Sequence, residues 1–360
     1  MKPTSHLAAL PAPHAGRVGW PWTEETPADA YAGRNDWPRI SIVTPSFNQA
    51  SYLEETIRSV LLQNYPNLQL IVIDGGSTDG SREILERYAP WLDHWESEPD
   101  RGQSHAINKG LARCTGEWFN WINSDDCLLP GALAAVGAAD PAALNFSGPE
   151  NTGPNLAETN LLGRTKVGPT FEDALVNHFI CQQGLFLRTD AVRAQGGVRE
   201  ELHYVMDLDL FARVLLQGGP ERIRETDVPL AFFRRHDAAK TSTASDRFFA
   251  EERRIMAGLG AVAGVSPQVL AHVVGSPLAF ANPGAGRIDP QRLELELARK
   301  YWWNGTIESA WRTRNFALFK REAAAFRFAF PDLRGGRFSR LHFLSRLPEP
   351  VLRFVSHFRS

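Results

Sequence analysis

Short apolar runs and amphipathic segments alternate through the first half of the chain, and this alternation limits the folds open to it. The segment from Ser51 to Leu61 carries apolar residues at helical spacing, and Ser51 with Glu54 matches a capping box. The apolar runs have the length of strands, and they occupy residues 40–43, 68–73, 91–97 (the weakest) and 118–122. Strands separated by helices predict βαβ units and a mostly parallel sheet.

The run Trp118–Ile122 stops abruptly at Asn123-Ser-Asp-Asp126. We interpret the run as a buried strand whose C-terminal end brings polar and acidic groups to a cleft, where open α/β sheets bind ligands. Mg²⁺ usually takes one or two carboxylates plus substrate phosphates, which suits this sequence. An Asx-rich turn that caps the helix beginning at Pro130 explains the same four residues. These residues alone leave both interpretations open.

Each predicted strand is followed by a polar loop. The Ser- and Gly-rich loops offer backbone N–H groups and helix N-termini, which suit phosphate, although glycine and serine also simply make tight turns. Four such loops at one sheet edge favour a nucleotide site. The spacing Gly75-Gly76-xxx-Gly80 is not GxGxxG, and no GxxxxGK[ST] occurs, which argues against dinucleotide-binding and P-loop folds.

Four motifs in this region together resemble the family 2 glycosyltransferases. They are Thr44-Pro-Ser-Phe-Asn48, Asp74-Gly-Gly-Ser-Thr-Asp-Gly-Ser81, Asp100-Arg-Gly-Gln-Ser-His-Ala-Ile-Asn-Lys-Gly110 and Asn123-Ser-Asp-Asp126. The resemblance spans roughly residues 39–242. It implies a GT-A fold, which is Rossmann-like with a mostly parallel sheet, and inverting sugar transfer from a nucleotide diphosphate donor with Mg²⁺ or Mn²⁺ on the diphosphate.

The resemblance also implies roles for individual residues. Asp125 matches the metal-binding last residue of the family's DxD motif, and His236, in an RxHxxxKT pattern, is expected to complete the metal shell. The expected donor-binding residues are Thr44, Pro45, Phe47, Asn48, Asp74, Gly76, Ser77, Arg101, Gly102, Asn123, Ser124 and Lys240. Asn123 departs from the family's Asp, and Gly75 stands where many relatives carry a second Asp that reads the base. Uridine is the expected donor nucleoside.

An acidic cluster opens a predicted helix at residues 201–213. The helix dipole alone is the ordinary explanation for carboxylates at this position. The family resemblance places the catalytic base at Asp207, which would take the proton of the attacking hydroxyl, and Asp209 is the reserve candidate. Gln182 and Gln183 are candidates for binding sugar hydroxyls, and cations from Arg234 onward are candidates for neutralising the departing diphosphate.

Composition limits the partners and the compartment. The formal net charge of −2 gives no overall attraction to nucleic acid. The three cysteines form no CxxC or Cys/His cluster, which favours reduced thiols in the cytoplasm. We expect no signal peptide and no transmembrane helix. Residues 312–360 hold eleven Lys and Arg against three Asp and Glu, a net of +8. This segment fits peripheral contact with the inner membrane face, or packing on the body or in a homodimer.

The sequence therefore predicts three parts: a mostly flexible arm at 1–38, rich in Pro, Ala and Gly, a GT-A domain at 39–242, and a helical extension at 243–360. Trp20, Trp22 and Trp37 suggest that the later part of the arm packs on the body. The expected function is transfer of a sugar, of the hexosyltransferase type, to a saccharide or lipid-linked acceptor, in cell-surface polysaccharide or glycan synthesis. A nucleotidyltransferase on a similar fold and a non-catalytic nucleotide-sugar-binding scaffold are the alternatives.

Overall fold

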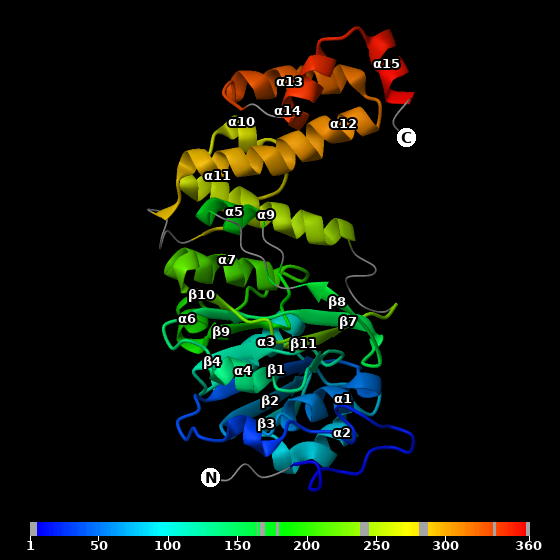
Figure 1. Ribbon diagram of the computed structural model, residues 1–360, viewed down its shortest axis with the longest axis vertical. Helices are drawn as coiled ribbons and strands as arrows, with labels where there is room; N and C mark the ends of the chain where they lie inside the picture. The colour runs from blue at the N-terminus through cyan, green and yellow to red at the C-terminus, as the bar shows by residue number, and fades with distance from the viewer. Residues whose placement is uncertain are drawn as a thin grey trace. The chain divides into compact units, whose positions relative to one another are not determined.

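The structure is a computed structural model that describes residues 6–163, 165, 170–177, 180–237, 245–280, 287–333 and 336–357 (Figure 1). The chain divides into two compact units. The first comprises the described parts of 1–167 and 178–248, and the second those of 168–177 and 249–360. The second unit therefore includes a short segment from the middle of the chain, and its main part begins six residues later than the predicted extension.

A seven-stranded sheet forms the centre of the first unit, in the order β10-β6-β9-β4-β1-β2-β3. Neighbouring strands from β4 to β3 are parallel, while β9 runs antiparallel to β4 and β6. The strands are β1 (Ile40–Ser46), β2 (Leu68–Asp74), β3 (His94–Ser97), β4 (Trp118–Trp121), β6 (Asn145–Ser147), β9 (Leu185–Arg188) and β10 (Ile223–Glu225). The sheet is thus the mostly parallel one that the alternation predicted.

Three helices connect the first four strands: α1 (Ala50–Leu61), α2 (Ser81–Tyr88) and α3 (Gln103–Arg113). β1 is buried along its whole length, as expected for a parallel strand covered on both faces. Helix α3 packs directly on β1 because Gly110 has no side chain. A Cβ atom at Gly110 would lie 2.4 Å from the Cγ1 atom of Val43.

A second, four-stranded sheet lies in the same unit, in the order β5-β11-β7-β8. Its strands are β5 (Cys127–Leu128), β7 (Glu150–Asn155), β8 (Glu158–Gly163) and β11 (Ala231–Arg234). β7 and β8 form an antiparallel hairpin within the Gly/Pro/Asn-rich stretch 147–169. The unit also contains η1 (Ala28–Tyr31), η2 (Ala89–Trp91), α4 (Ala132–Gly137), α6 (Thr189–Ala194), α7 (Met206–Gly218) and η3 (Pro220–Arg222).

The N-terminal segment packs on the sheet domain over a longer stretch than the later part predicted, since contacts with that domain already begin at His6 and Pro11. The fully buried guanidinium of Arg58 donates hydrogen bonds to the backbone carbonyls of Pro11, Pro21 and Trp22. The Tyr31 hydroxyl donates to the Gln63 carbonyl at 2.5 Å. The Pro/Ala/Gly composition indicated disorder, but the aromatic residues within it bury their rings, and this burial anchors the segment.

The second unit is helical. It contains α5 (Phe171–Val176), most of α9 (Ser245–Ala263), α10 (Pro267–Leu270), α11 (Pro290–Leu297), the π-helix η5 (Ala298–Ile307), α12 (Glu308–Arg312), α13 (Phe316–Ala329), α14 (Gly336–Ser345) and α15 (Glu349–His357). Figure 1 shows the green helix α5 among the yellow α9 and α11. The Asp289 N–H donates to Glu172 at 2.8 Å, and Lys300 donates to the Val176 carbonyl, which tie α5 to this unit. No helix among the described residues is both long and apolar enough to cross a membrane.

Candidate active site

The carboxyl ends of β1, β2, β3 and β4 lie along one edge of the sheet, since these strands are neighbours and parallel. The four polar loops that the sequence singled out follow these strands. The edge therefore brings the four motifs together, at the position where α/β sheets bind ligands.

Asp74, at the end of β2, is fully buried. Its Oδ2 atom accepts hydrogen bonds from the N–H groups of Gly76 and Ser77 and from the Ser97 hydroxyl, and its Oδ1 atom accepts one from the Ser77 hydroxyl. The carboxylate thus shapes the loop that follows it. The sequence predicted free N–H groups for phosphate in this loop, but those of Gly76 and Ser77 are directed at Asp74. A contact of Asp74 with the nucleoside stays a prediction.

The loop after β1 rests against the loop after β2. Asn48 adopts a left-handed φ of 53°, and its backbone N–H donates to the Ser77 hydroxyl at 2.7 Å, while its side-chain oxygen accepts from the Thr78 N–H at 3.0 Å. The Phe47 ring is 61% exposed, which leaves its face available to a ligand. Thr44 is fully buried in β1, and Pro45 is also buried, so they lie beneath the surface of this edge.

Gly75 departs from the family pattern at a crowded point. A Cβ atom at Gly75 would lie 3.1 Å from the Oδ2 atom of Asp100 and 3.2 Å from the Phe47 ring. A carboxylate of Asp100 therefore already stands beside the place where relatives carry an additional Asp. Sequence reasoning did not single out Asp100, although its position in the Asp-Arg-Gly-Gln motif was a signal.

The loop after β3 contributes the predicted residues Arg101 and Gly102. The Arg101 guanidinium is exposed and binds the Glu200 carboxylate, with Nη2 to Oε2 at 2.7 Å, which lowers the pKa of Glu200. Gly102 has a φ of 108°, which favours glycine, and its N–H donates to Asp100 at 2.7 Å. A role of Arg101 in donor binding stays a prediction, and in this structure its charge is paired.

Asn123 and Ser124 are held from several sides. The Asn123 side chain accepts a hydrogen bond from Gln103 at 2.7 Å and donates one to Asp126 at 3.0 Å. Ser124 is buried, and its carbonyl accepts from the Thr56 hydroxyl at 2.9 Å. The Asn in place of the family's first Asp is therefore built into the loop as a hydrogen-bonding bridge.

The two predicted metal ligands meet at the end of this edge. Asp125 Oδ2 and His236 Nε2 are 3.0 Å apart, although the two residues are 111 positions apart in sequence. Neither side chain is fully buried, with 21% of Asp125 and 14% of His236 exposed. No cluster of three or more such ligands occurs among the described residues. A carboxylate and an imidazole fit Mn²⁺ or Mg²⁺ only if substrate phosphates supply the remaining ligands.

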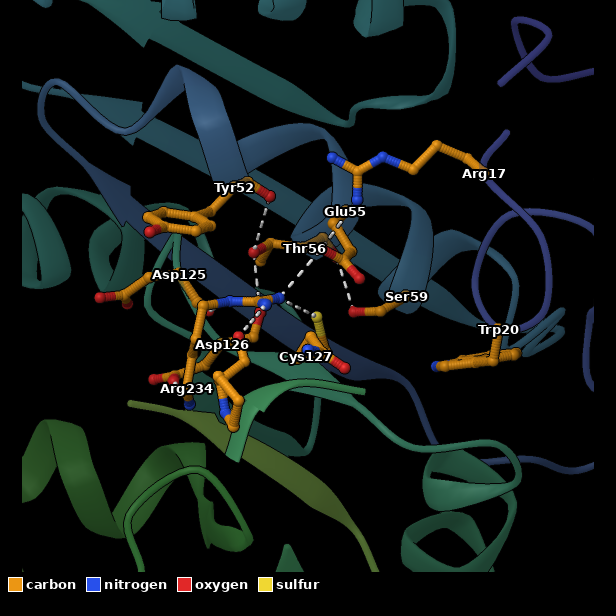
Figure 2. A network of polar contacts seen from close by, with 12 residues as sticks. Arg17, Trp20, Tyr52, Glu55, Thr56, Ser59, Asp125, Asp126, Cys127 and Arg234 are labelled. Atoms are coloured by element: carbon orange, nitrogen blue, oxygen red, sulfur yellow. Dashed lines mark hydrogen bonds and ion pairs between the residues drawn. The ribbon is translucent and has the colours of Figure 1, made fainter. Parts of the chain in front are cut away.

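Arg234, at the end of β11, contacts the Asp125–Asp126 segment (Figure 2). Its Nε atom donates to the Asp125 carbonyl at 2.8 Å, and its backbone N–H donates to the Asp126 carboxylate at 2.9 Å. Its Nη2 atom donates to Glu55 at 2.9 Å, and only 4% of the Arg234 side chain is exposed. The prediction that cations from Arg234 onward neutralise a diphosphate is therefore wrong for Arg234. Arg235 is exposed, and the predicted Lys240 lies outside the described residues.

Gln182 and Gln183 are buried. Gln183 donates to the Asp126 carboxylate at 2.7 Å, and Gln182 donates to the Asn120 side chain at 3.0 Å. The prediction that they bind sugar hydroxyls is wrong. The sequence could not show that these glutamines are buried, because a polar residue beside a strand can be either exposed or buried.

Asp207 lies in the first turn of α7, and its surroundings differ from those of Asp209. Burial raises the pKa of Asp207 to about 6, while the Leu208 N–H donates to its Oδ1 atom at 2.8 Å. Asp209 is fully buried and pairs with Arg213 at 2.6 Å and Arg199 at 3.5 Å. The two arginines neutralise the Asp209 carboxylate, so of the two residues the structure favours Asp207 as the group able to accept a proton.

Buried acidic groups connect the two ends of the candidate site. Glu150 in β7 is fully buried and accepts a hydrogen bond from the Gly184 N–H at 2.5 Å. Burial raises its pKa to about 8, and the charges of Asp126 and Asp207 contribute further. Burial, with the adjacent charge of Asp125, also raises the pKa of Asp126 to about 8. The adjacent residues Gln183 and Gly184 donate to Asp126 and Glu150 respectively, so these two carboxyl groups lie near each other.

Comparison with known proteins agrees with this geometry. The family model described as glycosyl transferase family 2 matches residues 41–138. The match covers 98 of the 360 residues, and within this segment the chain is similar to that family. TuaG of Bacillus subtilis, a glycosyltransferase whose name assigns it to teichuronic acid biosynthesis, is 38% identical over 92 residues, which are 25% of this chain and 36% of TuaG. This chain thus spans about a third of that relative.

Two further comparisons reach beyond the matched domain. An uncharacterized glycosyltransferase of Mycobacterium tuberculosis is 29% identical over 193 residues, which are 52% of this chain and 72% of that protein. The crystal structure of Staphylococcus aureus TarS 1–349 in complex with UDP-GlcNAc superposes with a TM-score of 0.53 at 16% identity, covering 89% of this chain and 87% of that one. At this identity the likeness concerns the fold, which is GT-A with added C-terminal helices, as predicted.

Proposed function

We propose that the protein is a glycosyltransferase that moves a sugar from a nucleotide diphosphate donor, with UDP as the expected nucleotide, to an acceptor hydroxyl. The observation that carries this proposal is the pairing of Asp125 with His236 at 3.0 Å, beside the four family motifs on one sheet edge. Such an edge suits a diphosphate. Mg²⁺ or Mn²⁺ held by Asp125 and His236 would supply positive charge to the diphosphate oxygens as they leave.

The proposed chemistry is a single displacement with inversion. Asp207 takes the proton of the acceptor hydroxyl, and the oxygen's electron pair forms a bond to the anomeric carbon. The bond from that carbon to the diphosphate breaks, and its electron pair leaves with the nucleoside diphosphate. A pKa of about 6 supports this role, because Asp207 is then ionised at neutral pH and still basic enough to accept a proton.

The proposals for the donor and the acceptor rest on similar proteins. TarS was crystallised with UDP-GlcNAc, and TuaG is assigned by name to teichuronic acid biosynthesis. By analogy we propose a UDP-sugar donor and a saccharide or lipid-linked acceptor of a cell-surface polysaccharide. We propose a cytoplasmic location, which agrees with Cys114, Cys127 and Cys181 forming no disulfide.

The first experiment is thermal stabilisation of the full chain by UDP, GDP, dTDP and CDP, each with and without Mn²⁺. Ligand that binds only the folded protein raises its stability by about 2.7 kcal/mol at a hundredfold excess over Kd. We expect a Mn²⁺-dependent shift with one nucleotide, abolished in Asp125→Ala. Asp209→Asn is not a suitable control because it breaks a buried ion pair, so the exposed Asp140→Ala serves instead. No shift with any nucleotide would contradict the donor site.

Product analysis separates the alternatives. A glycosyltransferase releases a nucleoside diphosphate, and a nucleotidyltransferase releases pyrophosphate from a nucleoside triphosphate. A scaffold binds the nucleotide sugar but releases neither product. Detection of nucleoside diphosphate from a panel of nucleotide sugars, lost in Asp207→Asn with nucleotide binding retained, would support transfer over both alternatives.

A further inference from the structure

Helices α13, α14 and α15, at the red end of the chain in Figure 1, expose large apolar side chains. Phe328 is 89% exposed, Phe343 62% and Phe354 65%, and Val351 on α15 is also exposed. Exposed phenylalanines that recur on successive helices are unusual, because each leaves a large apolar area in water. Other phenylalanines of the same helices, such as Phe319 and Phe326, are buried and form the core of this region.

The part of the chain that contains these helices also exposes mostly positive charge. Seven arginines are exposed among the described residues after 311: Arg312, Arg314, Arg321, Arg327, Arg340, Arg346 and Arg353. Only three acidic residues occur there. Glu322 is largely covered and accepts a hydrogen bond from Trp302, Glu349 pairs with Arg353, and Asp332 is exposed.

Exposed apolar residues share helix faces, and on α14 one of them shares its face with an arginine. On α14, Arg340 and Phe343 are three residues apart and so share a face. On α15, Val351 and Phe354 share a face in the same way. Partial burial, together with the charges of Arg327 on α13 and Arg346 after α14, lowers the pKa of His342 on α14.

From this arrangement we infer that α13, α14 and α15 form a docking surface for a bilayer that contains anionic lipid. The phenylalanines enter the boundary between headgroups and acyl chains, and the arginines bind the lipid phosphates. The inference goes beyond the proposed sugar transfer and does not depend on it.

Charge argues against self-association through this surface. A two-fold interface brings a patch against its own copy, so exposed arginines would face arginines. A bilayer rich in anionic lipid presents the opposite charge and an apolar layer beneath it. Because the whole chain has a net charge of −2, the attraction comes from this local surface and not from overall charge.

The test is co-sedimentation of the full chain with vesicles of phosphatidylglycerol mixed with phosphatidylcholine, and with pure phosphatidylcholine, at about 0.1 M salt, where the screening length is about 10 Å. We expect binding to the anionic vesicles only, weakened by higher salt. Phe343→Ser with Phe354→Ser should weaken binding by about tenfold or more for each phenylalanine. Both side chains are exposed, so the variant should keep its melting temperature.

Matched controls come from the same unit. Phe249→Ser removes a phenylalanine that is 60% exposed on α9, and it should leave vesicle binding unchanged. Arg340→Glu with Arg346→Glu should abolish binding, whereas Arg292→Glu on α11 should not. Equal binding by the double phenylalanine variant and the wild type would overturn the inference, as would no binding to anionic vesicles. A dimer in sedimentation velocity that Phe343→Ser with Phe354→Ser converts to monomer would also overturn it, in favour of a protein interface.

Discussion

Arg234 offers the sharpest test of how the candidate site is held in shape. Its side chain binds the Asp125 carbonyl, the Pro154 carbonyl and the Glu55 carboxylate. The change Arg234→Lys keeps the positive charge but replaces a planar fork by a single ammonium group, which cannot reach all three acceptors. We expect the lysine to keep one contact and lose two.

The expected magnitude follows from these contacts. Each hydrogen bond from a charged group contributes about 1.5–3 kcal/mol, so the loss of two should destabilise the protein by roughly 3–6 kcal/mol. Mutation of a residue that holds a metal ligand in place typically lowers metal affinity by about 10- to 100-fold. We therefore expect a loss of that size in Mn²⁺-dependent nucleotide binding. Titration calorimetry below the melting temperature measures the binding, and thermal unfolding measures the stability.

Arg58 supplies the matched control. It is also a buried arginine that donates to several carbonyls, but its partners are Pro11, Pro21 and Trp22 in the N-terminal segment. Arg58→Lys should cost as much stability as Arg234→Lys and leave nucleotide binding unchanged. Arg17→Ala, which removes a half-exposed partner 3.9 Å from Glu55, should change stability by less than about 1 kcal/mol. Equal binding by Arg234→Lys and Arg58→Lys would refute a positioning role for Arg234.

Two further predictions concern ionisation and crowding at the candidate site. The pKa of Asp207 is raised to about 6 in the folded state, so its contribution to stability is present at low pH and is lost as pH rises through 6. Asp207→Asn should therefore unfold at a higher temperature than the wild type at pH 8 but not at pH 4. In the wild type, kcat/KM should rise with pH to a plateau above about 6. A kcat/KM that does not change with pH would contradict the assignment of Asp207 as the base. Gly75→Asp should lower the melting temperature because the new carboxylate meets Asp100, and adding Asp100→Asn should restore much of it; identical melting curves of the single and double variants would show that charge is not the cause.

Local patterns in the sequence were enough for the first four strands and the helices between them. Apolar runs such as Leu68–Ile73 are too short for helices and are bounded by turn residues, and a parallel sheet covers such strands on both faces. The family motifs then identified Asp125 and His236, which the structure brings within 3.0 Å. Local sequence patterns could not predict the contact between these two residues, because it depends on β11 pairing with β5.

Tertiary structure decided which polar groups are available. The sequence suggested surface roles for Gln182, Gln183 and Arg234, but all three are buried: Gln182 bonds β4 itself, and Gln183 and Arg234 bond the loop that follows β4. Asp207 and Asp209 differ by two positions in one helix, yet only Asp209 is neutralised by arginines. Sequence specifies which groups a chain carries, because spacing and composition act locally. Burial, pairing and pKa depend on what other segments place beside each group, and only the folded chain determines that.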